Sequence, residues 1–230
     1  MAYQLTRWSE LGRLDGKEFV VKTIVTSQMP NVMAAHFGVK CYDCLTGFKY
    51  IARIIRNNEG KAKYIGGGEE SFGYLAGDYV RDKDAVSACS LAAEAAAWAM
   101  DTMGLTLYEW LQKLYVEFGF FREGLVSVVR KGMEGAAEIQ RMMVDYRADP
   151  PREIAGSPVV KINDFKLLES TDVRTGAKTL IEEEASNVLQ WFAADGTVVS
   201  VRPSGTEPKI KFYFGVRAEL ESVGDLDRGE

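Results

Sequence analysis

The segment FVVKTIVT at residues 19–26 narrows the choice of folds, because apolar and β-branched side chains follow one another almost without interruption. Such a run is typical of a strand buried on both faces, as in α/β sheets. The sequence after it predicts a helix over 31–37, a short strand over 40–43 and a helix over 50–56. The loop at Thr46 therefore lies between a strand and a helix, where α/β sheets commonly bind ligands.

An alanine-rich segment over 84–103 predicts a long helix. Asp84 is available as its N-cap, and Gly104 can end it. Its small side chains would let the helix lie close against a sheet, and Trp98 and Met100 are expected in the core.

A capping box predicts the next helix, because Thr106 is followed three residues later by Glu109. This helix is expected over 107–118. An aromatic cluster at 118–121 follows it and indicates the edge of a first domain.

The pattern changes after residue 121 to a strand, a helix and then several antiparallel strands, which is typical of an α+β domain. The expected elements are strands over 125–130, 196–202 and 209–216, a helix over 133–147, an extended polar loop over 168–184 and a hairpin beginning at 189–193.

A glycine-rich segment with two carboxylates, Gly66-Gly67-Gly68-Glu69-Glu70-Ser71-Phe72-Gly73, follows a strand-like stretch over 62–65. Consecutive glycines cost conformational entropy on folding, which indicates a sharp turn or a close approach of the backbone. Glu69 beside Ser71 suits the vicinal hydroxyls of a sugar, because a carboxylate accepts hydrogen bonds and a serine both donates and accepts. For this segment taken alone, a flexible solvated turn is the preferred interpretation.

The segment Arg202-Pro203-Ser204-Gly205-Thr206-Glu207-Pro208-Lys209 collects groups that suit an oxyanion between two expected strands. An arginine fork, two hydroxyls and an unobstructed glycine backbone can all donate to phosphate. Residues 202–217 contain four basic side chains and one acidic one, although the chain has a formal net charge of −5. These features favour a phosphate-binding loop, and an ordinary surface turn remains the alternative.

Four motifs together resemble the α-D-phosphohexomutase family, of the phosphoglucomutase and phosphomannomutase type that includes phosphopentomutases. The family's sugar-binding loop G-E-[EM]-S-[FYG]-G matches residues 68–73, and its phosphate-binding loop R-x-S-[GN]-T matches residues 202–206. Residues 46–49 look like its T-G-[FWH] loop, and residues 81–84 are similar to its R-[ED]-K-D run. The resemblance extends over residues 20–216.

The resemblance implies domains three and four of a four-domain enzyme. The expected fold is one α/β/α mixed-sheet domain over 1–121, which binds the sugar, followed by a smaller α+β, TBP-like domain over 122–230, which binds phosphate. The expected partner is a phosphorylated hexose or pentose.

The resemblance also implies roles for individual residues. One group would contact the sugar: Thr46, Gly47, Lys49, Glu69 and Ser71. A second group would hold the phosphate that is not transferred: Arg202, Ser204, Gly205 and Thr206, with Lys209 or Lys211 as a supporting cation. Lys83 would act in catalysis through proton transfer or its charge, and a surface ion pair with Asp82 or Asp84 is the simpler alternative.

Two family motifs are missing from this sequence, the phosphoserine loop T-x-S-H-N-P and the magnesium loop D-G-D-x-D-R. Asp82 with Asp84 would not suffice for a hard cation, so no metal site is expected here. The resemblance implies Mg²⁺ and a sugar bisphosphate activator only for the full-length enzyme. We expect this chain to need the missing N-terminal domains as partners and to be inactive alone.

Composition excludes several other classes. The chain has 230 residues, 47% of them hydrophobic, which is enough for two domains with separate cores. Neither a membrane span nor a signal peptide is indicated, so a cytoplasmic protein without membrane partners is expected. The negative net charge argues against binding nucleic acid. Cys41 and Cys44 form a C-x-x-C pair, but Cys89 does not supply the further ligands of a zinc site. The pair is expected to be two reduced, semi-buried thiols, and a redox dithiol is the alternative.

Three hypotheses follow from these observations. The leading one is the sugar- and phosphate-binding half of a phosphohexomutase, an isomerase that moves phosphate between C1 and C6, or C5, of a sugar through a bisphosphate intermediate. The second is a non-catalytic phosphosugar-binding module. The third is a structural domain with vestigial loops, in which Arg202→Ala would leave phosphosugar affinity unchanged.

Overall fold

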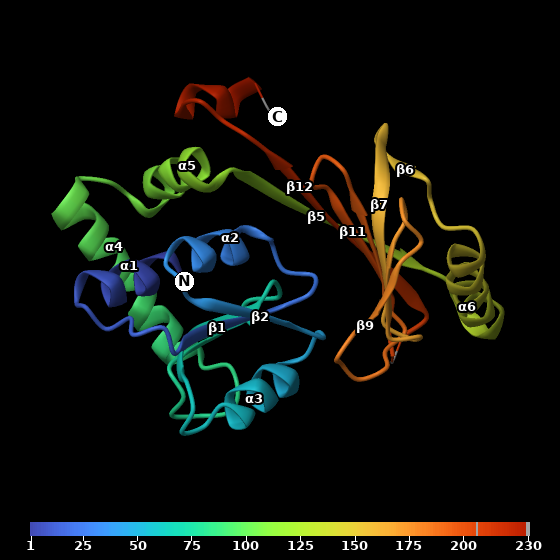
Figure 1. Ribbon diagram of the computed structural model, residues 1–230, viewed down its shortest axis with the longest axis horizontal. Helices are drawn as coiled ribbons and strands as arrows, with labels where there is room; N and C mark the ends of the chain where they lie inside the picture. Colours follow the sequence, from blue (N-terminus) through green and yellow to red (C-terminus); the bar gives the residue numbers. More distant parts are fainter. Residues whose placement is uncertain (206, 229–230) are drawn as a thin grey trace. The chain divides into compact units, whose positions relative to one another are not determined.

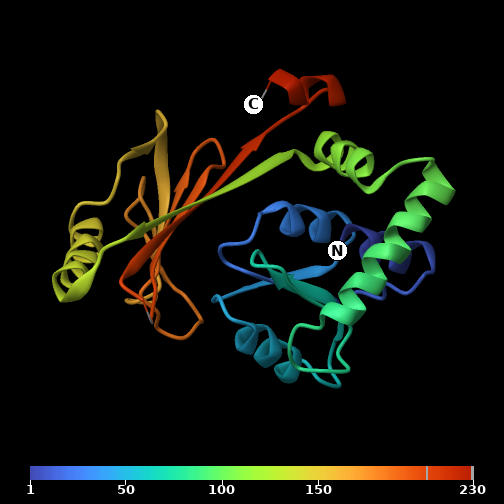
Figure 2. The ribbon, with the colours of Figure 1, turned by 180° about the vertical axis from the view of Figure 1, so that it is seen from behind.

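The computed structural model describes residues 1–205 and 207–228, and the chain divides into two compact units. The first unit consists of Met1–Phe121 together with Ala218–Glu230, and the second of Arg122–Arg217. The returning segment contains a 3-10 helix, η1 (Val223–Arg228), which contacts α5 (Leu107–Phe118) of the first unit. Each unit has its own sheet and its own core, and the colours of Figures 1 and 2 distinguish them along the chain.

The first unit contains a four-stranded sheet in the order β2-β1-β3-β4. Its strands are β1 (Glu18–Thr23), β2 (Lys40–Cys44), β3 (Lys63–Glu69) and β4 (Gly73–Ala76). β1 pairs in parallel with β2 and β3, and β4 returns antiparallel to β3. The sheet is therefore mixed, and the carboxyl ends of its three parallel strands lie at one edge.

Helices cover both faces of this sheet. They are α1 (Ala2–Glu10), α2 (Met29–His36), α3 (Phe48–Asn57), α4 (Ala85–Met103) and α5. Val20 packs with residues of α1, α2 and α5, whereas Phe19 and Val21 pack with α3. Figure 1 shows α2 and α3 on opposite sides of the sheet. Burial on both faces explains the uninterrupted apolar run in β1 and confirms the α/β/α architecture.

The predicted ends of α4 are confirmed. The Asp84 side chain accepts a hydrogen bond from the Val86 N–H, and Gly104 ends the helix with a φ of 67°. α4 lies beside the edge strand β4 (Figure 2). The expectation that Met100 is a core residue was wrong, because it is 52% exposed; the helix buries Ala95 and Ala99 instead.

The capping box of α5 is also confirmed, since Thr106 and Glu109 exchange hydrogen bonds in both directions.

The second unit contains an eight-stranded sheet in the order β5-β12-β11-β10-β7-β8-β9, with β6 paired to β7. Its strands are β5 (Phe120–Val129), β6 (Glu153–Ile154), β7 (Ser157–Asp164), β8 (Glu169–Asp172), β9 (Lys178–Leu180), β10 (Leu189–Ala193), β11 (Val198–Pro203) and β12 (Lys209–Ala218). β10 pairs antiparallel with β7 and β11, and β11 pairs antiparallel with β12. β8 pairs antiparallel with β7 and β9. This antiparallel sheet confirms the α+β class.

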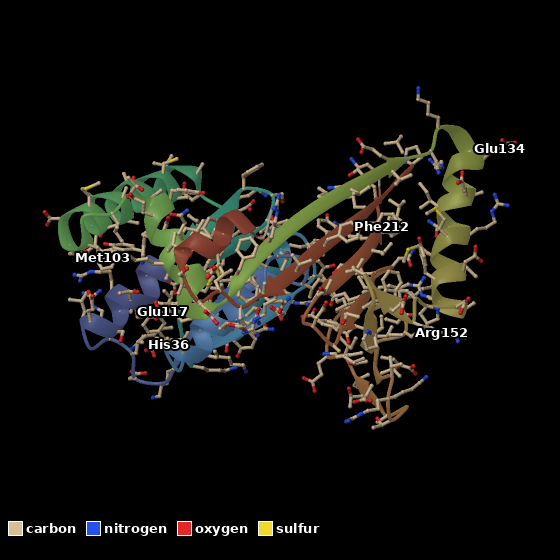
Figure 3. All side chains as sticks on the ribbon, turned by 90° about the horizontal axis from the view of Figure 1, so that it is seen from above. His36, Met103, Glu117, Glu134, Arg152 and Phe212 are labelled. Carbon is tan, nitrogen blue, oxygen red and sulfur yellow. The ribbon has the colours of Figure 1, made fainter. Side chains whose placement is uncertain are left out.

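One helix, α6 (Gly132–Ala148), packs on this sheet. Its Ile139 and Met143 lie against Trp191, Val201 and Ile210. Glu134 lies in its first turn and Arg152 follows its other end, as labelled in Figure 3.

An ion pair fastens the carboxyl end of α6 to β7. The Arg147 guanidinium donates two hydrogen bonds to the Asp164 carboxylate, at 2.8 and 3.3 Å. Both side chains are mostly buried, with 16% and 11% exposed.

Two expectations about irregular segments were wrong. The glycines at 66–68 belong to β3 rather than to a turn, so this strand is longer than expected. The polar segment 168–184 contains the hairpin of β8 and β9 rather than an extended loop. Its turn is stabilised by Asp172, whose carboxylate accepts the Thr175 N–H at 2.8 Å, and by Gly176 with a φ of 72°.

Within the described residues, none of the helices is both long and apolar enough to span a bilayer.

Candidate functional site

The carboxyl edge of the sheet in the first unit brings together three segments that are far apart in sequence. β2 leads into the loop of Thr46 and Gly47 before α3. The end of β3, the turn at 70–72 and the first residue of β4 form the segment that we call the glycine-rich loop, residues 66–73. Lys83 lies in the segment between β4 and α4. This edge is where ligands bind in α/β sheets.

Glu69 is the centre of this arrangement. Its Oε1 accepts a hydrogen bond from the Gly47 N–H at 2.7 Å, and its Oε2 lies 3.9 Å from the Lys83 ammonium. Only 10% of the Glu69 side chain is exposed. The carboxylate is therefore oriented by a backbone amide and by a cation, with little freedom to rotate.

Gly73 provides the room for this contact. A Cβ at this position would lie 3.0 Å from Cδ of Lys83 and 3.2 Å from Oε2 of Glu69. The lysine ammonium also lies 3.8 Å from the Asp82 carboxylate and 5.8 Å from the centre of the Phe48 ring. Lys83 thus makes the ion pair with Asp82 that was weighed as an alternative, and it also reaches Glu69.

The run of glycines in β3 is required by close neighbours. A Cβ at Gly66 would lie 2.6 Å from Oε1 of Gln4, and a Cβ at Gly67 would overlap the Val21 carbonyl oxygen. A Cβ at Gly68 would overlap the carbonyl oxygen of Gly73. Close approach of other groups, rather than a sharp turn, explains these glycines.

The other residues expected to contact the sugar lie near this edge but do not bond to the Glu69 carboxylate. Thr46 is half-buried in the loop after β2, and Ser71 is exposed at the tip of the glycine-rich loop. Lys49 is exposed in the first turn of α3, and its ammonium lies 4.7 Å from the centre of the Tyr50 ring.

Sequence reasoning missed Lys22. Its side chain is 1% exposed, and its ammonium lies 2.8 Å from the Asp43 carboxylate, at the carboxyl ends of β1 and β2. A buried lysine requires such a partner, because an unpaired charge is costly to bury. A lysine inside the apolar run at 19–26 was the signal that could have found it.

The second candidate site is the basic loop of the second unit, which we define as residues 202–209. Arg202 on β11 and Lys211 on β12 are paired in register, so two cations lie on neighbouring strands. Like charges in opposed positions destabilise a sheet pair, and an anion between them would relieve the repulsion.

The basic loop is closed by its own hydrogen bonds. The Ser204 N–H donates to the Lys209 carbonyl at 2.8 Å, and the Glu207 N–H donates to Oγ of Ser204 at 3.3 Å. Lys209 forms an ion pair with Glu207, and its hydrogen bond lowers the pKa of that carboxyl. Lys209 is therefore already paired with a carboxylate. Thr206 lies outside the described residues.

Ser204 and the exposed Gly205 line a cavity of about 390 Å³ together with the first turns of α6. Within the described residues, no side chain caps this helix at Lys131. The N–H groups at a helix start and the positive end of its dipole favour an anion. The cavity wall therefore combines the helix start with the basic loop.

Among the described residues, no group of three or more histidine, cysteine, aspartate or glutamate side chains could hold a metal ion. None of the three cysteines forms a disulfide; Cys44 is buried, Cys41 is half-buried and Cys89 is exposed. Burial raises the pKa of Cys41 to about 12, with a smaller contribution from the Asp43 charge.

Comparison with known families identifies both units. The family "Phosphoglucomutase/phosphomannomutase, alpha/beta/alpha domain III" matches residues 1–118, and the family "Phosphoglucomutase/phosphomannomutase, C-terminal domain" matches residues 159–228. This chain belongs to the phosphoglucomutase/phosphomannomutase family. The resemblance deduced from the four motifs is confirmed, as is the assignment to domains three and four.

Curated relatives include two phosphoglucomutases from staphylococci. The protein of Staphylococcus aureus (strain N315) is 34% identical over 215 residues, which cover 94% of this chain and 38% of the relative. The protein of Staphylococcus saprophyticus is 31% identical over 222 residues, covering 96% of this chain and 40% of the relative. The chain thus spans about two fifths of the length of these relatives.

Two solved structures share the fold. The match to the open form of pp63/parafusin, a phosphoglucomutase from Paramecium, has a TM-score of 0.59 at 17% identity and covers 88% of this chain and 33% of the Paramecium chain. The match to a phosphoglucomutase/phosphomannomutase family protein from Burkholderia thailandensis has a TM-score of 0.55 at 15% identity and covers 98% of this chain and 39% of the Burkholderia chain.

Proposed function

We propose that this chain is the sugar- and phosphate-binding half of a phosphohexomutase. The full enzyme would move phosphate between C1 and C6, or C5, of a sugar through a bisphosphate intermediate. The observation that carries the proposal is the meeting of Gly47, Glu69 and Lys83, because three separate family motifs converge on one carboxylate.

In the first unit, Glu69 would accept hydrogen bonds from sugar hydroxyls. Its carboxylate has four lone-pair sites, so the Gly47 amide and the Lys83 ammonium leave acceptor capacity free for a ligand. Ser71, exposed at the loop tip, would both donate to and accept from a neighbouring hydroxyl. Thr46, Gly47 and Lys49 would form the side of this site that α3 contributes.

Lys83 would act through its charge or as a proton donor and acceptor. Its side chain is half-exposed, and its ammonium lies beside two carboxylates, those of Glu69 and Asp82. A cation beside the sugar-binding carboxylate can stabilise negative charge that develops on a sugar oxygen.

In the second unit, Arg202 and Lys211 would supply the charge that binds phosphate, and the hydroxyl and amide groups of Ser204, Gly205 and Thr206 would complete its hydrogen bonds. Lys209 would add a further positive charge, if its ammonium leaves Glu207 or contacts both Glu207 and the phosphate. The start of α6 would contribute further N–H groups.

The proposal assigns the other steps to parts of a longer enzyme. A phosphoserine, Mg²⁺ and a sugar bisphosphate activator would act on the missing N-terminal domains, so the chain alone would bind phosphosugars without isomerising them. We propose a domain boundary between residues 121 and 122, and a cytoplasmic location.

Nuclear magnetic resonance titration of the isolated chain tests this function. Glucose 1-phosphate is expected to shift amide signals of both the glycine-rich loop and the basic loop, whereas inorganic phosphate should shift only those of the basic loop. The proposal fails if glucose 1-phosphate shifts neither loop.

Arg202→Ala is expected to weaken glucose 1-phosphate binding by about 1.5–3 kcal/mol, or about 10- to 150-fold, because a charge-assisted partner is lost. Lys166→Gln is the control, because it removes one charge from an exposed position of the same unit outside the basic loop. Equal affinities of Arg202→Ala and the unmodified chain would favour a vestigial loop.

A further inference from the structure

The second carboxylate of the glycine-rich loop, Glu70, is held by an element outside that loop. Its Oε2 accepts hydrogen bonds from Oγ1 of Thr23 at 3.0 Å and from Oγ1 of Thr26 at 3.3 Å. The two threonine hydroxyls lie 2.8 Å apart, so the three oxygens form a closed group. Thr23 is the last residue of β1, and Thr26 lies between β1 and α2; we refer to residues 23–26 as the β1–α2 turn.

This turn is itself firmly anchored. The Lys22 ammonium donates to the carbonyl oxygens of Thr23 and Thr26, each at 3.3 Å, and the Thr26 N–H donates to the Thr23 carbonyl at 3.0 Å. The same ammonium is paired with Asp43 on the neighbouring strand. The hydroxyls that reach Glu70 therefore project from a turn fixed by a buried charge.

The tip of the glycine-rich loop needs such support. Phe72 has a φ of 63°, a left-handed conformation that is unfavourable for a bulky residue, and its side chain is fully exposed. A strained residue without packing of its own persists only when its surroundings impose the conformation. On one side Gly73 lies in β4, and on the other the side-chain contacts of Glu70 tie the tip to the turn.

We propose that Glu70 is a positioning residue, which ties the glycine-rich loop to the β1–α2 turn through Thr23 and Thr26 and so holds Glu69 and Ser71 in the conformation that binds sugar. Glu70 stands between these two residues in sequence, so fixing its side chain limits the backbone of both. This inference rests on the proposed function of Glu69 and Ser71. It assigns Glu70 no contact with the sugar itself.

The expected size of the effect follows from the population of the binding conformation. When only a fraction of molecules is competent to bind, the apparent Kd rises by the inverse of that fraction. Loss of two hydrogen bonds to a carboxylate would reduce the competent fraction to about one tenth, which corresponds to a rise of about tenfold in Kd.

The test compares three variants of the chain: Glu70→Ala, the double variant Thr23→Val/Thr26→Val, and the double variant Thr23→Ser/Thr26→Ser. The first two remove the hydrogen bonds, whereas the serine variant keeps both hydroxyls. We expect about a tenfold rise in the Kd for glucose 1-phosphate in the first two and near-normal binding in the serine variant. The Kd for inorganic phosphate should not change in any of them.

Amide hydrogen exchange without ligand provides a second measurement. Exchange at residues 69–72 should be faster in Glu70→Ala and in the valine variant, and unchanged in the serine variant. Because Glu70 is exposed, its replacement should leave the fold intact even where the buried Thr23 does not tolerate valine.

The outcomes separate this inference from the proposed function. An unmodified chain that does not bind glucose 1-phosphate contradicts the proposed function, and the exchange rates still decide whether Glu70 restrains the loop. An unmodified chain that binds, with unaltered Kd and exchange in Glu70→Ala, overturns the positioning role alone.

Discussion

Replacement of Arg147 by methionine is expected to destabilise the second unit substantially. The guanidinium makes two hydrogen bonds to Asp164 and a third, at 3.1 Å, to the Met143 carbonyl. Methionine would retain most of the apolar stem but would leave a largely buried carboxylate without its cation. Breaking a fully buried pair costs about 3–5 kcal/mol, and the partial exposure of this one reduces the expected cost to about 2–3 kcal/mol.

The same helix offers a matched control. Arg130 donates to Glu138 of α6 at 2.8 Å, the same distance, but these side chains are 44% and 43% exposed. Arg130→Met is therefore expected to cost less than about 1 kcal/mol, because solvent screens an exposed pair.

The assay is urea unfolding followed by the amide signals of β10 and β11, which belong to the second unit. With a urea dependence of about 1.5 kcal/mol/M, Arg147→Met should lower the midpoint by about 1.3–2 M and Arg130→Met by less than about 0.7 M. Equal shifts in the two variants would refute the argument that burial decides the strength of these pairs.

Three further predictions concern the first unit. Gly67→Ala should destabilise it by more than about 3 kcal/mol in thermal unfolding, because the new Cβ would overlap a carbonyl oxygen of β1; a small loss would mean that the strands can separate. At pH 8, a thiol reagent should modify exposed Cys89 quickly and spare half-buried Cys41, whose pKa is raised to about 12; equal rates would contradict that raised pKa. The hydrogen bonds from Thr106 lower the pKa of Glu109 in the folded state, so the capping box should stabilise α5 above the unfolded pKa and lose that effect as the pH falls through the folded value. Carboxyl titration by NMR should show this lowered pKa, and an ordinary value would contradict the capping geometry.

Local signals allowed much of the first unit to be predicted. The run at 19–26 indicated a doubly buried strand because both faces of β1 contact helices. Both ends of α4 and the start of α5 could be predicted, because Asp84, Gly104 and the Thr106 capping box act on backbone groups a few residues away. The capping signals do not depend on the tertiary structure.

Features that depend on distant partners were not predictable. The glycines of β3 are explained by Gln4, Val21 and Tyr74, which come from other elements. The β8–β9 hairpin is polar on both strands and lacks apolar alternation, so only its pairing with β7 identifies it as part of a sheet.

The candidate site divides in the same way. The motifs predicted Glu69, Lys83 and the loop at Gly47, but not that Gly47 and Lys83 would meet on the Glu69 carboxylate. The position of Lys22 inside the apolar run marks it as unusual, but its partner Asp43 lies on another strand, so the sequence does not identify the pair.

The crowded glycines of β3 have a consequence for how this protein can change during evolution or engineering. Residues 66–68 leave no room for any side chain, so the stem of the glycine-rich loop offers almost no accessible mutations. Ser71 and Phe72 at its tip are exposed and have space around them. Under the proposed function, new sugar preferences should therefore arise at these two positions, and a library randomised there should retain far more folded members than one randomised in the stem.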